Sequence, residues 1–191
     1  GALPAECPAE FVTCFADVHS SVIYYSFRAW ASDGTSWGIE QGVSEVYLHA
    51  EADKSERYKA LTGALLRLFE VAQQGFKCGQ RTLGMRLGLA DEGWEPDMVR
   101  EFCRKTRGLF RPTKGFPGMG RARLQKSKEY PLSINVGVDH FKHDLARLLQ
   151  RARAKDGSIE PGFFHLHREP KLSYCQHMCA EEWRPKANKE G

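Results

Sequence analysis

Three aspartates lie near the ends of segments that we expect to form strands or to begin a helix. Asp17 comes near the end of the apolar run FVTCFADV, Asp91 ends LGMRLGLAD, and Asp139 precedes an amphipathic stretch. A buried carboxylate without a partner costs several kcal/mol or is neutralised by a shift of its pKa. Hard divalent cations prefer such oxygen ligands. We therefore take these three residues as candidate metal ligands.

The chemistry that three clustered carboxylates could support is phosphodiester hydrolysis. Two Mg²⁺ or Mn²⁺ ions roughly 4 Å apart can activate a water molecule and stabilise the leaving oxygen. Simpler explanations stay open for two of the aspartates: Asp91 could favour a turn before Gly93, and Asp139 could cap its helix. Asp17 is harder to explain in this way, because no turn begins until after Val18.

A segment rich in positive charge follows in the second half of the chain. Residues 104–128 contain no acidic side chain and nine basic ones, which are Arg104, Lys105, Arg107, Arg111, Lys114, Arg121, Arg123, Lys126 and Lys128. Glycines and prolines interrupt them, so a flexible loop is expected rather than a helix. Such a loop suits a phosphate backbone. A solvated loop without a partner would explain the composition equally well.

Six cysteines are scattered without a CxxC pair. Reduced thiols in a core are the expected state, since disulfide frameworks belong to small secreted chains. The alternative is a zinc site formed by His165, His167, Cys175 and Cys179, whose spacing fits the range of known zinc sites.

Periodicity predicts the elements that would position these residues. Three consecutive strands are expected, and two further strands alternate with three helices. A capping box at Asp53 and Glu56 begins the first helix, and Pro96 begins the second. The expected strands are 11–18, 22–30, 35–45, 83–91 and a strand ending at 139, and the expected helices start after 53, at 96 and near 139.

This order of elements is that of an RNase H-like α/β domain. The expected sheet is mixed, with three antiparallel strands followed by parallel ones, and helices cover both of its faces. The first strand would be central and apolar on both faces. We expect an extension at residues 1–10, the domain at residues 11–183 and a disordered polar tail at residues 184–191.

Composition and length bound the class of protein. With 191 residues and 41% hydrophobic content, the chain can bury a real core. It has neither an apolar run long enough for a membrane span nor a signal peptide, so a cytosolic protein is expected. Since it begins with Gly1, we expect a domain of a longer polypeptide.

Several short motifs then occur in a particular order: LADEGW at 89–94, MVREFCR at 98–104, Lys114-Gly115, VGVDHFK at 136–142, PGFFHLH at 161–167 and YCQHMCAEEW at 174–183. With them the chain resembles the C-terminal nuclease domain of the large terminase subunit of lambda-like tailed phages. That enzyme cuts concatemeric double-stranded viral DNA during genome packaging. The resemblance covers residues 11–183.

The resemblance implies roles for individual residues. Asp17, Asp91 and Asp139 match metal ligands, and Lys142 matches a lysine that contacts phosphate. Glu181 is a further candidate for the site. His19 stands where the family usually has Gln, and Phe15 where it usually has Gly; His19 is a candidate extra ligand, and a simple turn residue is the alternative. With Lys142, the candidate DNA-binding residues are Arg104, Arg107, Arg111, Lys114, Arg121, Arg123 and Lys126.

The implied partners are double-stranded DNA, an ATPase motor domain of the same longer polypeptide, the small terminase subunit and the portal, in the cytoplasm of the host bacterium. No G-x-x-x-x-G-K-[ST] occurs, so this chain should not itself hydrolyse ATP. Two other readings remain: a non-catalytic nucleic-acid-binding or docking module, zinc-stabilised in one version, and a relative of resolvases or transposases.

Overall fold

The computed structural model describes residues 3–47, 51–118, 122–125, 133–167 and 169–179. Their centre is an eight-stranded mixed sheet with the strand order β10-β3-β2-β1-β6-β7-β9-β8. Its strands are β1 (Phe11–Val18), β2 (Val22–Trp30), β3 (Ser36–Glu45), β6 (Met85–Asp91), β7 (Phe110–Phe116), β8 (Ala122–Gln125), β9 (Ser133–Gly137) and β10 (Phe164–His165). A separate hairpin joins β4 (Phe76–Cys78) to β5 (Arg81–Leu83).

The expected change of direction within the sheet is confirmed. β1, β2 and β3 are antiparallel neighbours, whereas β6, β7 and β9 follow as parallel strands on the other side of β1. The first strand is therefore central, and the mixed arrangement agrees with an RNase H-like fold. The edge strand β8 returns antiparallel to β9.

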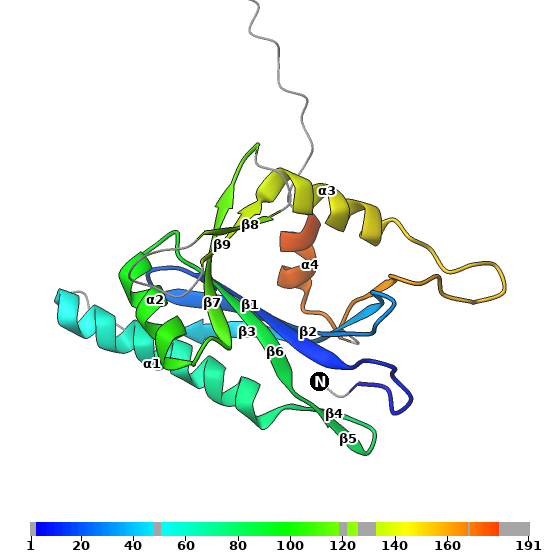
Figure 1. The fold of residues 1–191 in the computed structure, drawn as a ribbon, viewed down its shortest axis with the longest axis horizontal. Helices are drawn as coiled ribbons and strands as arrows, with labels where there is room; N and C mark the ends of the chain where they lie inside the picture. Colours follow the sequence, from blue (N-terminus) through cyan, green and yellow to red (C-terminus); the bar gives the residue numbers. More distant parts are fainter. Residues whose placement is uncertain (1–2, 48–50, 119–121, 126–132, 168, 180–191) are drawn as a thin grey trace, which may run out of the picture.

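In the described part of the chain, helices flank the sheet on both of its sides (Figure 1). They are α1 (Lys54–Gln74), α2 (Pro96–Lys105), α3 (Val138–Leu149) and α4 (Leu172–Cys179). The predicted capping box begins α1, with Asp53 accepting from the Glu56 N–H, and Gly75 ends it. Among the helices of the described residues, none is long and apolar enough to cross a membrane.

The hydrophobic core lies between one face of the sheet and the helices α1 and α2. In β1 the alternate residues Val12, Cys14, Ala16 and Val18 are buried there. Leu61 and Leu65 of α1 and Val99 and Phe102 of α2 complete the same core. Gly88 is needed at one close contact, because a Cβ there would lie 2.4 Å from the Phe110 ring.

The other face of the sheet is more open than the sequence led us to expect. Phe15 is 46% exposed, and Tyr24 and Val43 on neighbouring strands are also exposed. The amphipathic helix α3 contacts β9, yet none of its residues is buried. Helices thus flank both faces, as predicted, but α3 is not packed closely enough to bury the face of β1 that carries Phe15.

The basic segment is also more ordered than predicted. Residues 110–116 form β7, which pairs with β6 on one side and β9 on the other, and β8 follows. Phe110, Pro112 and Thr113 are buried in β7. The glycines and prolines suggested a flexible loop, but burial of these side chains against α2 and the neighbouring strands favours a strand.

Candidate functional site

Asp17 and Asp91 lie side by side at the carboxyl ends of two neighbouring strands. β1 and β6 are parallel neighbours in which Ala16 pairs with Ala90, so each aspartate follows a member of this pair. Ala16 and Ala90 are fully buried on the helical face, whereas the two aspartates are partly exposed on the open face. Neighbouring strands lie about 4.8 Å apart. The structure thus brings together two of the three predicted carboxylates.

The two carboxylates affect each other electrostatically. The pKa of Asp91 is raised, first because burial disfavours its charged form and second because the negative charge of Asp17 lies close by. A hydrogen bond from the Gly93 backbone opposes this rise. A divalent cation between the two aspartates would relieve their repulsion, so this pair suits a metal ion.

Gly93 allows the chain to turn close to the Asp91 carboxylate. A Cβ atom at position 93 would lie 2.9 Å from Asp91 Oδ2, so a side chain there would force the carboxylate to shift. The turn Glu92-Gly93 was predicted from the sequence as an ordinary end of a strand. The structure adds that the glycine leaves the space that the carboxylate occupies.

His19 is a third polar group at this end of the strands, beside Asp17. Its Nε2 lies 3.0 Å from Asp17 Oδ2, and its ring makes an edge contact with Tyr24 at 5.7 Å between centroids. Asp17 and His19 are 43% and 53% exposed, so both side chains remain accessible from solvent. His19 is thus placed where it can orient Asp17.

Asp139 does not join this pair. It lies in the first turn of α3, after β9, and β7 separates β9 from β6 in the sheet. Its Oδ2 accepts a hydrogen bond of 2.9 Å from the Gly118 N–H. Across the described residues, no group of three or more His, Cys, Asp or Glu side chains could hold one metal ion.

The structure describes only some of the remaining candidate metal ligands, which are Glu181 and the proposed zinc ligands. Glu181 lies outside the described residues, as does the side chain of Cys179. His165 stacks on Trp37 with ring centroids 5.1 Å apart, and His167 Nδ1 accepts from the Glu169 N–H. Cys175 is a free, half-buried thiol.

The predicted DNA-binding residues are spread over several elements. Arg111 in β7 pairs with Leu89, on the face that carries Asp91, and Lys114 follows Thr113, the register partner of Asp91. Arg104 forms an ion pair of 2.7 Å with Glu101, which offsets part of its charge. Arg107 has a left-handed backbone after α2, and Lys142 is exposed on α3. Arg121, Lys126 and the side chain of Arg123 lie outside the described residues.

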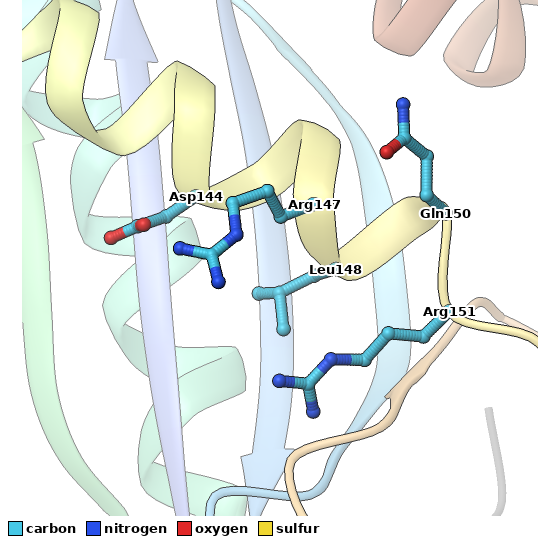
Figure 2. A pocket seen from close by; sticks show the side chains of 5 residues that line it. All are labelled: Asp144, Arg147, Leu148, Gln150 and Arg151. Atoms are coloured by element: carbon cyan, nitrogen blue, oxygen red, sulfur yellow. The ribbon is translucent and has the colours of Figure 1, made fainter.

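A hollow of about 440 Å³ borders α3 (Figure 2). The residues that line it are Asp144, Arg147, Leu148, Gln150 and Arg151. Figure 2 shows α3 in front of the strands, with the guanidinium groups of Arg147 and Arg151 on the same side of the helix as Leu148. Leu148 is half-buried and borders this hollow.

Sequence reasoning did not single out Glu92, although it follows Asp91 directly. Successive residues of a strand point to opposite faces. Asp91 is partly exposed, whereas Glu92 is 5% exposed and ion-paired with Arg100. Two successive acidic residues at the end of a strand indicate that one side chain is exposed and the other is buried. Only the structure shows which of the two is buried.

Comparison with known proteins identifies one family. The family described as terminase large subunit gpA, endonuclease domain, matches residues 3–191. No curated protein matches the sequence.

Some solved structures are weakly similar. An exopolyphosphatase from Cytophaga hutchinsonii ATCC 33406 has a TM-score of 0.38 and 7% identity, over 55% of this chain and 34% of that one. A Ppx/GppA phosphatase from Aquifex aeolicus has a TM-score of 0.37 and 10% identity, over 55% and 36%. The chain thus spans about a third of the length of these two proteins. Scores this low support no conclusion about function.

Proposed function

Because this chain belongs to the family of endonuclease domains of gpA-type terminase large subunits, we propose that it hydrolyses phosphodiester bonds of double-stranded, concatemeric viral DNA with the help of divalent metal ions. The observation that carries the metal dependence is the pairing of Asp17 and Asp91 on adjacent parallel strands, on the open face of the sheet.

The donor set of this pair suits Mg²⁺ or Mn²⁺. Asp17 and Asp91 would hold the first ion through carboxylate oxygens, and His19, whose Nε2 contacts Asp17 Oδ2, would orient that carboxylate. Asp139 and Glu181 are the candidates for a second ion, and Asp139 would reach the pair only if α3 moved towards β6. Such ions, when bound, neutralise charge on the scissile phosphate and lower the pKa of the attacking water.

The protein's own residues would bind and orient the DNA. Arg111 lies on β7 on the face that carries Asp91, and Lys114 lies in the part of β7 that extends past Asp91, the last residue of β6. Both can contact phosphates near the scissile bond. Contacts to the backbone carry little sequence information. We therefore propose that the choice of the cut site depends on partners, namely the small terminase subunit, the portal and an ATPase motor domain, in the cytoplasm of the host bacterium.

Nicking of supercoiled plasmid tests this proposal. The purified chain is incubated with Mn²⁺, with Mg²⁺ and with EDTA, beside Asp17→Asn and the control Asp156→Asn, whose carboxylate is exposed in a distant loop. We expect cleavage with the divalent ions only. Loss of a metal ligand should lower the rate by about 10³-fold or more, equivalent to about 4 kcal/mol, while Asp156→Asn stays at the wild-type rate.

Full activity of Asp17→Asn, or cleavage that persists in EDTA, would refute the proposal. Metal content by mass spectrometry addresses the alternative. Stoichiometric zinc together with no manganese-dependent cleavage would instead favour a zinc-stabilised nucleic-acid-binding module.

A further inference from the structure

Glu92 forms a buried polar cluster directly behind Asp91. Its Oε2 accepts a hydrogen bond of 2.6 Å from Arg100 Nε on α2, and its Oε1 accepts one of 2.9 Å from the Ser133 hydroxyl on β9. The Glu92 side chain is 5% exposed, and Ser133 is buried as well. Glu92 therefore links the end of β6 to a helix and to a strand that is not its neighbour in the sheet.

Further hydrogen bonds connect the same edge of the sheet through β7. The Glu92 N–H donates to the Thr113 carbonyl at 2.8 Å, and the Thr113 hydroxyl donates to the Ile134 carbonyl at 2.6 Å. The Ser133 hydroxyl also lies 3.3 Å from the Pro112 carbonyl. Together these bonds tie the ends of β6, β7 and β9 to one another.

Packing alone does not account for this cluster. A buried ion pair often stabilises a protein no more than apolar side chains of similar volume would. What the pair and its hydrogen bonds provide is a defined geometry. The cluster fixes the backbone next to two of the candidate metal ligands. Asp91 immediately precedes Glu92, and β9 continues through Gly137 into the helix that carries Asp139.

From this arrangement we propose that Glu92 is a positioning residue for the metal-binding carboxylates. It is not a ligand, since its side chain lies on the helical side of the sheet, where Arg100 and Ser133 hold it. By fixing the end of β6 against α2, β7 and β9, it sets where the Asp91 carboxylate lies relative to Asp17. This inference rests on the proposed function, because it assumes that the aspartate pair binds the metal.

The test compares Glu92→Gln with a control that removes a similar buried polar link far from the aspartates. Thr106 is 3% exposed, and its hydroxyl donates to the Cys103 carbonyl and accepts from the Phe110 N–H, at the opposite end of β7. Thr106→Val should therefore cost stability without moving Asp91. Ser133→Ala is a milder variant of the cluster itself, and it serves if Glu92→Gln does not fold.

Three quantities are measured for each variant: Mn²⁺ affinity by calorimetry without DNA, the Mn²⁺ dependence of plasmid nicking, and the melting temperature in EDTA. We expect Glu92→Gln to weaken Mn²⁺ binding about 10-fold or more, as for other residues that orient metal ligands, and to shift nicking to higher Mn²⁺. Ser133→Ala should shift both in the same direction by less. Thr106→Val should lower the melting temperature and keep the wild-type Mn²⁺ affinity.

Wild-type Mn²⁺ affinity in a folded Glu92→Gln or Ser133→Ala protein would overturn the inference. Equal losses of affinity in Thr106→Val and the Glu92 variant would also overturn it, since they would indicate a general effect of stability. The proposed function fails separately, through Asp17→Asn: if that variant loses nicking while Glu92→Gln behaves as wild type, only the positioning role is wrong.

Discussion

At the scale of single residues, the aspartate pair is an arrangement that the protein maintains at a cost. Asp91 is partly buried and next to a second carboxylate, and both effects raise its pKa. A carboxyl whose pKa is higher in the folded than in the unfolded protein binds more protons when folded. The free energy of unfolding therefore decreases as the pH rises from the ordinary pKa of an aspartate through the raised pKa of Asp91.

Asp91→Asn should accordingly stabilise the metal-free protein at neutral pH while it abolishes nicking. We expect a melting temperature on the order of 2 °C higher in EDTA at pH 7, which corresponds to about 0.5–1 kcal/mol in a chain of this size. The difference should shrink as the pH falls through the raised pKa, because the wild-type carboxyl then becomes neutral. Scanning calorimetry of both proteins from pH 7 to pH 4 measures this.

Mn²⁺ provides the control for that experiment. A bound ion stabilises the folded state in proportion to its affinity, so Mn²⁺ should raise the melting temperature of the wild type and not that of Asp91→Asn. A variant that is less stable than the wild type in EDTA at neutral pH would contradict the electrostatic account.

At the scale of elements, one face of the sheet forms the hydrophobic core and the other carries the two aspartates. In β1 the residues Val12, Cys14, Ala16 and Val18 build the core with α1 and α2, while Phe15 and Asp17 face the open side. α1 contributes five buried residues to this core and begins at a complete capping box. The stability of the domain and its chemistry are thus placed on opposite sides of one sheet.

This separation predicts that weakening α1 lowers stability without changing the site. Asp53→Ala removes the cap that accepts from the Glu56 N–H at 2.8 Å. The expected loss is about 1 kcal/mol, or roughly 3 °C in melting temperature. The nicking rate per folded molecule should stay at the wild-type value; a lower rate at temperatures where the variant is fully folded would show that α1 influences the site.

At the scale of the whole molecule, the location of positive charge matters more for DNA binding than the net charge does. The formal net charge is only +4. Arg111 nevertheless lies in β7 opposite Leu89, on the face that carries Asp91, and it is half-exposed. Lys59, which is exposed, belongs to α1 on the other side of the sheet. Of these two basic residues, only Arg111 is placed to meet DNA that reaches the aspartates.

Arg111→Ala should therefore weaken DNA binding and its dependence on salt, and Lys59→Ala should not. Each phosphate contact that is lost lowers the slope of log K against log salt by about 0.9 for duplex DNA. Titrations of a labelled duplex at several salt concentrations, in Ca²⁺ or EDTA to prevent cutting, give both slopes. Equal slopes for the two variants would place the DNA elsewhere.

Much of the fold could be predicted because its signals are local. Three such signals act within a few residues: the apolar run at residues 11–18, the Asp53 capping box and Pro96. The structure has the strand and the two helices that they predict. β7 could not be predicted in this way. Its glycines and prolines resemble a loop, and it becomes a strand only because Phe110 and Thr113 are buried among β6, β9 and α2, which are distant in the sequence.

The sequence by itself determined the residue types of the site: acidic side chains at the ends of β1 and β6, and the motifs of the family. Only the tertiary structure decided which of them meet. Parallel pairing of β1 with β6 brings Asp17 and Asp91 together. Asp139 stays apart because β7 lies between β6 and β9. Glu92 is buried because successive residues point to opposite faces of the sheet. The reason is that strand order and facing are properties of long-range pairing, which no local pattern of residues specifies.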